Sequence, residues 1–223
     1  GNGKDALANL PKDTAMVFAM NVDRAKKSPV FQDVVKLAKN NPDFAKGMDL
    51  LKAEASFDVT RDVRTLVVGL AADFEKSQKG VFLMEGKFDA KKFVSFAKKN
   101  AKSINIGNHR KVAYYTLDGA AEVAFLGKYI ALSPKGNMPN VIDVYKGKAA
   151  SIKKNKRFMA KFADTNVSKD FWAVFLLPPE IKQQMAPQLG GNSIDALMAA
   201  IDVQKGLSTG IRLAAATVAG AQA

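Results

Sequence analysis

The sequence predicts an α+β protein built from antiparallel sheets with packed helices, arranged as two unequal tandem half-repeats. Three observations predict this class. Short apolar runs alternate with amphipathic stretches of helical period along the 223 residues. Several neighbouring apolar runs are separated by two-residue turns, which join antiparallel strands. The order of strands and turns near the N-terminus also recurs near the C-terminus.

The first elements are a strand and two helices. Residues 1–13 form a polar lead, and residues 14–20 predict a buried strand. Ser28 is expected to cap a helix with Pro29 at its first position, where the missing N–H costs nothing. Pro42 begins a second helix directly after the first. We expect the inward faces of these helices to carry Phe31, Val34, Val35, Ala38, Phe44, Met48, Leu51 and Ala55.

A hairpin and a third helix come next. A turn-rich connection at residues 57–62 leads into strands at 66–72 and 81–88, joined by a loop at 76–80. Asp89 is expected to cap the following helix, with Phe88 and Phe93 at the two positions of a hydrophobic staple. The inward face of that helix carries Phe93, Phe96, Ala97 and Ala101, and the outward face carries Lys91, Lys92, Lys98, Lys99 and Lys102.

A strand meander and two more helices follow. Two-residue turns at Asp118-Gly119 and Gly127-Lys128 connect strands that are expected at 111–117, 121–126 and 129–133. Helices are then predicted at 138–145 and 151–163, followed by a buried strand at 171–177 that Pro178-Pro179 closes.

The pattern of the first half recurs in the last part of the chain. Val174, in the strand at 171–177, aligns with Val17, and the hairpin at 196–217 repeats the hairpin at 66–86. The second copy is shorter by the length of one helix and its loop. We therefore divide the chain into a polar lead (1–13), a first α+β unit (14–167) and a second, shorter or truncated α+β unit packed on the first (168–223).

The charge balance favours acidic partners. Lys and Arg total 34 against 21 Asp and Glu, so the net charge is +13 and the pI is about 9.8. Such a charge favours nucleic acid, anionic lipid or acidic polysaccharide. Most of the cations are Lys, whereas Arg is the residue that reads guanine edges and grips phosphate bidentately. Specific nucleic-acid reading is therefore not expected.

The composition argues against most enzyme chemistry. The chain has no Cys and a single His, which excludes disulfides, thiol nucleophiles and metal sites with several Cys or His ligands. The sequence contains no nucleotide-binding, nucleophile-elbow or metalloprotease motif. No apolar run reaches the roughly 18–20 residues that span a bilayer. We expect no catalytic residues, no cofactor and no metal.

The remaining titratable candidates have simpler explanations. His109 is expected in a solvated polar loop at 107–111, where its replacement by Ala leaves fold and function intact. Asp58 and Asp62 flank a turn beside two Arg, which predicts ion pairing and capping. Asp195 and Asp202 fall on opposite faces of one predicted strand and form no carboxylate pair.

A Lys-rich segment at residues 146–161 is the candidate polyanion-binding site. An apolar stripe of Ile152, Met159, Phe162 and Ala163 makes it amphipathic. Such a segment lies on an anionic surface, or packs on the core with a solvated Lys face. It contains no acidic residue, and its cations are Lys146, Lys148, Lys153, Lys154, Lys156, Arg157 and Lys161.

Several short stretches resemble a known family. They are Leu10-Pro11-Lys12-Asp13-Thr14, Asn21-Val22-Asp23, Lys27-Ser28-Pro29-Val30-Phe31, Phe57-Asp58-Val59-Thr60-Arg61-Asp62-Val63, Leu66-Val67-Val68-Gly69, Glu85-Gly86-Lys87-Phe88-Asp89, Ala124-Phe125-Leu126-Gly127 and Leu176-Leu177-Pro178-Pro179-Glu180. Together they resemble a family of bacterial secreted proteins and lipoproteins of unknown function, common in myxobacteria-like lineages. The resemblance implies an envelope location, periplasmic or anchored to the outer membrane, with a lipobox Cys before Gly1. It brings no catalytic residues.

These observations predict a non-enzymatic cell-envelope protein that binds or scaffolds another macromolecule through a Lys-rich face. The expected partner is an anionic lipid, an acidic polysaccharide or another envelope protein. Two alternatives stay open: a carrier of a hydrophobic ligand such as a lipid, and a non-specific nucleic-acid binder. A closed apolar cavity lined by Met and Phe favours the carrier, and the strand residues Met16, Met20, Phe82 and Met84 are candidates for it. A basic face with exposed aromatic residues favours nucleic acid.

Overall fold

All the described strands belong to one antiparallel sheet. The computed structural model describes residues 2–189, 194–204 and 212–217. The strands are β1 (Thr14–Asn21), β2 (Val63–Ala71), β3 (Gly80–Gly86), β4 (Ile104–His109), β5 (Val112–Leu117), β6 (Ala121–Leu126), β7 (Tyr129–Pro134), β8 (Phe171–Leu176), β9 (Ile194–Ile201) and β10 (Arg212–Thr217). They form a 10-stranded sheet in the order β10-β9-β8-β1-β2-β3-β7-β6-β5-β4. The fold is therefore α+β with antiparallel pairing, as the sequence predicts.

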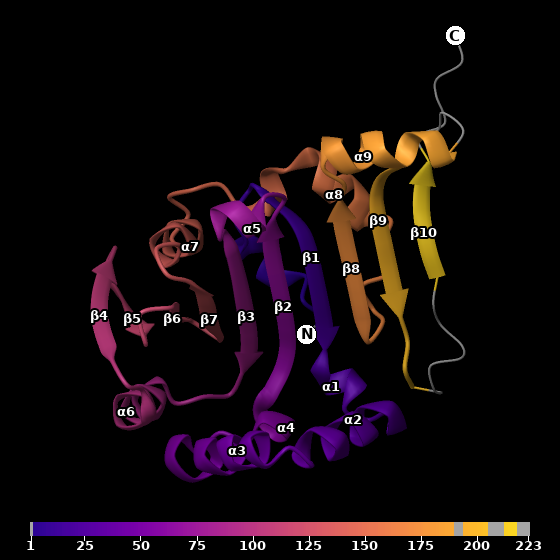
Figure 1. Ribbon diagram of the computed structural model, residues 1–223. Coiled ribbons are helices and arrows are strands. Elements are labelled where there is room, and N and C mark those ends of the chain that lie inside the picture. The colour runs from indigo at the N-terminus through magenta and orange to yellow at the C-terminus, as the bar shows by residue number, and fades with distance from the viewer. Residues whose placement is uncertain (1, 190–193, 205–211, 218–223) are drawn as a thin grey trace.

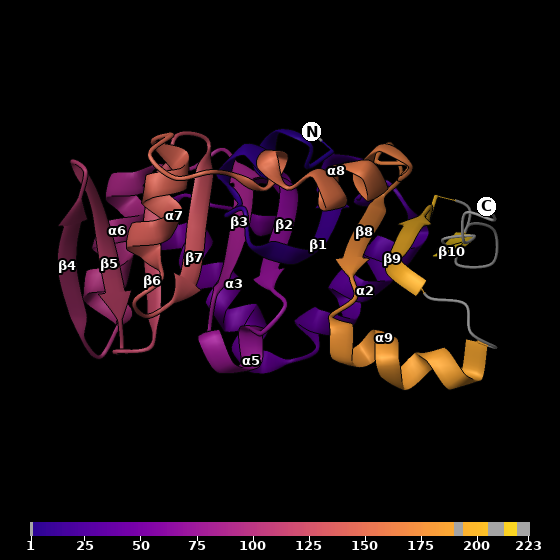
Figure 2. The ribbon, with the colours of Figure 1, turned by 90° about the horizontal axis from the view of Figure 1, so that it is seen from above.

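The helical segments lie at both ends and on both faces of the sheet. They are η1 (Asp5–Asn9), α1 (Val22–Ala25), α2 (Pro29–Lys39), α3 (Pro42–Ala55), α4 (Val59–Asp62), α5 (Phe74–Ser77), α6 (Ala90–Asn100), α7 (Met138–Tyr145), η2 (Ile152–Lys154), α8 (Lys156–Ala163), α9 (Pro179–Met185) and η3 (Ala186–Leu189). Figure 1 shows α1–α4 and α6 at one end of the sheet, and α5, α8 and α9 at the other. In Figure 2, α7 and α8 lie on one side of the sheet and α9 on the other.

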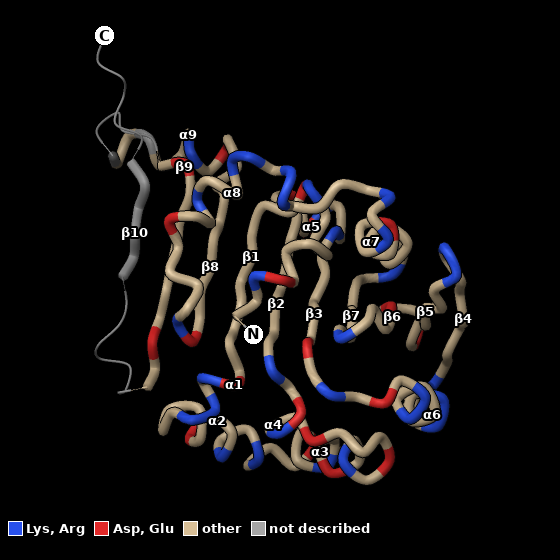
Figure 3. The backbone as a smooth tube through the Cα atoms, turned by 180° about the vertical axis from the view of Figure 1, so that it is seen from behind, with Lys and Arg blue, Asp and Glu red and all other residues tan. Residues whose placement is uncertain are grey.

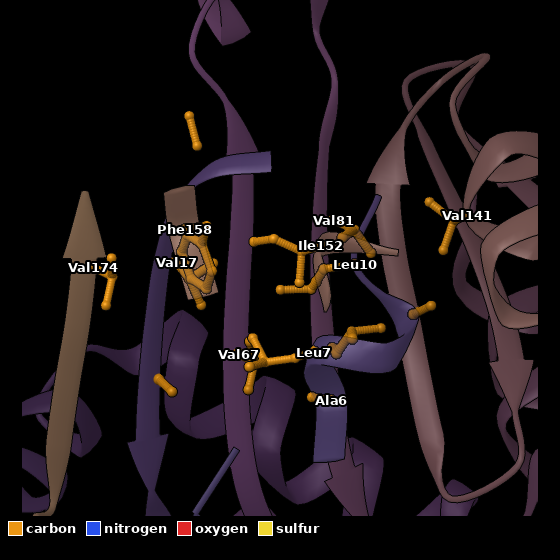
Figure 4. Close-up of a cluster of buried hydrophobic side chains, with 14 of the residues drawn as sticks. Ala6, Leu7, Leu10, Val17, Val67, Val81, Val141, Ile152, Phe158 and Val174 are labelled. Atoms are coloured by element: carbon orange, nitrogen blue, oxygen red, sulfur yellow. The ribbon is translucent and has the colours of Figure 1, made fainter. Parts of the chain in front are cut away.

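The main core lies between the sheet and the segments η1, α7, η2 and α8. Alternate residues of the central strands point to this side, because side chains of a strand alternate between its faces. Val17, Val67 and Leu83 are buried there against Leu7 and the other side chains of the cluster (Figure 4). η1 and the α7–α8 region are therefore held to the sheet by apolar burial, at roughly 25 cal/mol per Å² of apolar surface removed from water.

The other face of the sheet is only partly covered. Its side chains are mostly half-buried, and Phe18 keeps 40% of its surface exposed and Leu197 keeps 37%. A second cluster covers one end of this face, where Phe31 of α2, Leu51 of α3 and Phe93 of α6 pack around the buried Phe57. The four candidate ligand-cavity residues lie on this face, half-buried in β1 and β3: Met16, Met20, Phe82 and Met84.

The local signals for helix and hairpin boundaries are confirmed. The Ser28 hydroxyl accepts a hydrogen bond from the Phe31 N–H at 3.1 Å, and Pro29 begins α2. The Asp89 carboxylate accepts from the Lys91 and Lys92 N–H groups at the start of α6. The strands of the β5–β7 meander lie within a residue of their predicted positions.

Several sequence expectations are wrong. The stretch 107–111 is not a loop, because Gly107, Asn108 and His109 belong to the unpredicted strand β4, paired with β5. The helix expected at 151–163 is two segments, η2 and α8, separated at Asn155, which caps α8. The loop at 76–80 contains part of α5, and α9 was not predicted. Val34 and Phe44, expected to face inward, are 57% and 46% exposed because no described element covers them.

Two strands that are far apart in the sequence, β1 and β8, are neighbours inside the sheet. β1 pairs with β8 in antiparallel fashion, and Val17 lies opposite Val174. On one side β1 continues into β2 and β3, and on the other β8 continues into β9 and β10. Both groups run strand, helical connection, hairpin, which is the order expected of the two half-repeats. Whether they are a true repeat, and where the units divide, stay predictions.

Candidate anion-binding site

A polar groove opens at the end of the sheet that carries α5 and α8. Its volume is about 680 Å³. Three lysines from three separate connections line it: Lys12 before β1, Lys79 between α5 and β3, and Lys135 between β7 and α7. The other lining residues are Pro11, Asp13, Ser77, Gln78, Gly136, Asn137, Asn140 and Ala150. We call this hollow the Lys groove.

Backbone and amide hydrogen bonds hold the walls of the Lys groove together. The Lys12 N–H donates to the Ala150 carbonyl at 3.0 Å, and the Asn155 amide donates to the Lys12 carbonyl at 3.2 Å. The Asn137 amide donates to the Gly80 carbonyl and to the Ser133 hydroxyl, both at 2.9 Å. The groove is therefore built from connections that the pairing of β1, β2, β3 and β7 brings together.

The predicted Lys-rich segment adjoins the Lys groove. Ala150, in the middle of the segment, is part of the groove wall. Lys146 and Lys148 follow α7, Lys153 and Lys154 belong to η2, and α8 carries Lys156, Arg157 and Lys161. Figure 3 shows Lys and Arg gathered at this end of the sheet, along α8 and beside α5. We call the groove and the segment together the Lys-rich end.

The apolar stripe of the segment anchors it to the core. Ile152 and Phe158 are fully buried, Phe162 is 7% exposed, and the Phe162 ring contacts Trp172 edge-on at 5.3 Å between centroids. Ala163, expected in this stripe, is exposed, and Phe158 is buried in its place. The lysines therefore project from a segment whose position is fixed by buried aromatic side chains.

Most cations of the segment have no carboxylate partner. Within the part of the chain that the structure describes, no ion pair involves any of Lys146, Lys148, Lys153, Lys154, Lys156 and Lys161. Lys146 instead lies over the Tyr145 ring at 5.6 Å. The charge of this surface is thus left for solvent or a bound anion.

Arg157 has a different role from the lysines around it. Its guanidinium forms an ion pair with Asp195 of β9 at 2.5 Å and donates to the Leu177 and Asp195 carbonyls. Lys182 of α9 contacts the same carboxylate. The hydrogen bond from Arg157, with that from Lys182, lowers the pKa of Asp195 to about 2 despite partial burial. Arg157 therefore ties α8 to β9, which sequence reasoning did not anticipate.

A second hollow of different chemistry lies between α6 and the sheet. This apolar groove has a volume of about 390 Å³. Phe93, Phe96 and Ala97 of α6 form one wall, and Tyr115 and Phe125 of the meander contribute to the other. Met84 is the one residue of the four predicted ligand-cavity candidates that lines it. This groove is open to solvent, so it is not the closed apolar cavity that would favour a carrier.

His109 is partnered rather than solvated. Its Nε2 lies 2.7 Å from Asp143 Oδ1 of α7, and the neighbouring Arg110 pairs with the same carboxylate. The hydrogen bonds from Arg110 and His109 lower the pKa of Asp143. The His109–Asp143 contact therefore ties β4 to α7.

The predicted acidic pairs serve the fold. Asp58 accepts from the Thr60 N–H at the start of α4, and Asp62 pairs with Arg61 at 2.7 Å. Asp195 and Asp202 engage different partners, since Asp202 pairs with Arg24 at 2.7 Å. Over residues 2–189, 194–204 and 212–217, no three acidic or imidazole groups come close enough to hold a metal ion.

The fold and the Lys-rich end define an α+β protein with a single wide antiparallel sheet and a basic groove at one end of it. No protein-family model and no curated protein sequence matches the chain. The same fold occurs in crystal structures of TP0453. Form I has a TM-score of 0.52 at 7% identity, covering 89% of this chain and 73% of TP0453. Form III has a TM-score of 0.56 at 8% identity, covering 89% and 74%.

This likeness concerns the fold alone, because so few residues are identical. It assigns no role to the side chains that line the Lys groove. Among the described helices, none is long and apolar enough to cross a membrane.

Proposed function

We propose that this chain is a non-enzymatic protein of the bacterial envelope that binds an anionic macromolecule at its Lys-rich end. One observation carries the proposal: among the described residues, no ion pair involves the six lysines of the 146–161 segment or the two groove lysines Lys12 and Lys135. The envelope location, periplasmic or anchored to the outer membrane, rests on the family resemblance.

The energetics favour a distributed Coulombic attraction. Each Lys close to an anionic membrane contributes about 1 kcal/mol, and the effect fades beyond a Debye length of about 8 Å at physiological salt. Several lysines on one surface therefore give useful affinity without any one being essential. Lys is a solvated point charge, so this surface suits an anionic lipid layer or polysaccharide better than a base sequence.

A matched pair of variants tests the proposal. The triple variant Lys153→Gln, Lys154→Gln and Lys156→Gln removes three exposed charges and leaves Arg157 with Asp195. The control variant Lys91→Gln, Lys98→Gln and Lys102→Gln removes three exposed charges from α6 and the residues after it. Both change the net charge equally, so only position distinguishes them.

Co-sedimentation with anionic liposomes and with an acidic polysaccharide, at low and high salt, is the measurement. We expect the first variant to lose most of its binding at low salt and the control to keep most of it. Raising the salt concentration should steeply weaken binding by the wild-type protein. Equal losses of binding in both variants would show that binding depends on the net charge of the protein and not on the position of the lysines. Failure of the wild-type protein to bind either polyanion at low salt would end the proposal.

The apolar groove beneath α6 favours a second function, the transport of a hydrophobic ligand such as a lipid. Its lining of Phe, Met, Val, Leu and Ile side chains would be covered from water by an acyl chain. Ala97→Phe fills the groove, whereas Ser95→Phe places the same side chain at an exposed position of α6. Displacement of a fluorescent fatty acid should be lost in the first variant and kept in the second.

A further inference from the structure

We infer that the Lys groove binds a phosphomonoester group, held by Lys12, Lys79 and Lys135 with Asp13 accepting the phosphate hydroxyl. The inference rests on the proposed function, because it names the chemical group that the Lys-rich end recognises. It differs in kind from the surface attraction of the 146–161 segment. An open groove of about 680 Å³ has room for one compact group, which its lining side chains can contact together.

The arrangement of charges suits a compact dianion. The three lysines come from three different connections of the chain and line the same groove. Lys12 and Lys135 form no ion pair in the described part of the chain, and Lys79 pairs with Asp13 at 3.3 Å. Three lysines and one aspartate leave the groove with an excess of positive charge. A phosphomonoester carries a charge of about −1.5 to −2 at neutral pH and would neutralise it.

The walls supply neutral hydrogen-bond partners as well. Ser77 and Asn140 line the same groove and offer a hydroxyl and an amide, whereas the Gln78 amide donates to the Phe74 and Glu75 carbonyls. The Asn137 amide donates both of its hydrogens within the protein, to the Gly80 carbonyl and the Ser133 hydroxyl, so it fixes this wall in place and is not itself a donor to the ligand.

Asp13 should make the groove bind a phosphomonoester more tightly than a sulfate. A phosphomonoester keeps one proton in about half of its molecules near pH 6, and that hydroxyl can donate to a carboxylate. A sulfate carries no proton at this pH. Its oxygens and the Asp13 carboxylate are all acceptors, so no hydrogen bond would join them. The carboxylate of Asp13 is half-exposed and tied only to Lys79, so it is accessible to a ligand.

The lining also argues against an uncharged sugar as the recognised group. No aromatic side chain belongs to the described lining of the Lys groove, so no ring is present on which a sugar face could pack. The ammonium groups instead select for negative charge. The organic part of the ligand would occupy the remaining volume beside Asn140 and Ala150.

Calorimetric titration with sn-glycerol 3-phosphate and with inorganic sulfate, at pH 6 and low salt, tests the inference. We expect the wild-type protein to bind glycerol phosphate and to prefer it to sulfate. The double variant Lys12→Gln and Lys135→Gln should weaken glycerol phosphate binding at least about tenfold. The control Lys91→Gln and Lys98→Gln, of equal charge change, should bind as the wild type does. Asp13→Asn should bring the affinities for glycerol phosphate and sulfate close together.

A vesicle experiment separates a lipid headgroup from a free phosphate. Phosphatidic acid presents a phosphomonoester, and phosphatidylglycerol presents a diester without a titrating hydroxyl. Stronger binding to phosphatidic acid vesicles at matched surface charge, lost in the Lys12 and Lys135 variant, would identify the headgroup as the source. Equal binding to both vesicles, with glycerol phosphate still bound in solution, would identify a free phosphomonoester.

The two proposals fail in distinguishable ways. The Lys153, Lys154 and Lys156 variant should lose vesicle binding and keep glycerol phosphate binding, because its changes lie outside the groove lining. A protein that binds polyanions but neither glycerol phosphate nor phosphatidic acid selectively would overturn the groove assignment and leave the proposed function standing. A wild-type protein that binds sulfate as tightly as glycerol phosphate would also overturn it.

Discussion

His109 Nε2 lies 2.7 Å from Asp143 Oδ1 and joins the tip of the β4–β5 hairpin to α7. Arg110, the next residue, has a left-handed backbone with φ +48° and reaches the same carboxylate. The side chains of two neighbouring residues at a tight turn thus converge on one carboxylate of α7. This contact holds the outermost hairpin of the sheet against the α7 layer.

Replacing His109 by Ala should remove one of these two ties. We expect the variant to fold and to keep polyanion binding, with a loss of about 1 kcal/mol in the free energy of unfolding, since the Arg110 pair remains. Urea unfolding followed by circular dichroism measures the loss. A loss above about 2 kcal/mol would show that His109 carries more of the hairpin packing than this geometry indicates.

The Asp195 carboxylate should make stability depend on acid pH. Its pKa is about 2 in the folded protein, against 3.8 without its partners, because Arg157 and then Lys182 favour the ionised form. A depressed folded-state pKa stabilises the fold above pH 4, and that contribution is lost as the pH falls toward 2. The full contribution is about 2 kcal/mol, since one pKa unit corresponds to about 1.4 kcal/mol.

Asp195→Asn should therefore be less stable than the wild-type protein at pH 6 and nearly equal to it at pH 2. Thermal unfolding of both proteins across this range, in the same buffer series, gives the comparison. A difference that stays constant with pH would mean that the loss comes from packing and not from the charge. Asp33→Asn, at an exposed position in α2, serves as the control.

Two glycines should respond to Ala in opposite directions. A Cβ on Gly86 would lie 2.5 Å from the Asp62 carbonyl oxygen, and a backbone atom in a strand pairing cannot easily shift. We expect Gly86→Ala to cost more than about 2 kcal/mol. Gly47 lies within α3 with no atom near its added Cβ, so Gly47→Ala should stabilise by up to about 1 kcal/mol. Denaturant midpoints of the two variants decide both points.

Leu37 is 71% exposed on α2 despite the strong apolar pattern of that helix. Leu37→Gln should change the free energy of unfolding by no more than about 0.5 kcal/mol. Leu7→Gln, at a fully buried position in η1, should cost several kcal/mol and provides the contrast. A large loss at Leu37, measured by urea unfolding, would contradict the exposure of this helix face.

Elements with strong local signals were predictable from sequence. Ser28 and Asp89 cap their helices as expected, because a side chain that accepts from nearby N–H groups needs no tertiary contact. β4 was missed because its six residues include only two large apolar side chains, Ile104 and Ile106, and the latter is 61% exposed. An edge strand with one partner leaves little pattern in the sequence.

The apolar faces of helices show the limit of periodicity. The spacing of Val34 and Phe44 indicates a hydrophobic side of each helix, but it does not say whether another element covers that side. The same limit applies to the Lys groove. Lys12, Lys79 and Lys135 meet only because β3 pairs with β7, across an intervening helix and three strands, and this pairing is invisible to local patterns.

The pairing of β1 with β8 constrains the order in which the strands can pair while the chain is being synthesised. During synthesis β1 finds β2 early, but its other edge stays open until residues 171–176 leave the ribosome. The seam between β1 and β8 therefore closes late, and β9 and β10 join the sheet beyond β8 later still. Until then the nascent chain presents an unpaired apolar strand edge, the feature by which partly made sheets aggregate, so we expect shielding of this edge during translation to improve the yield of folded protein.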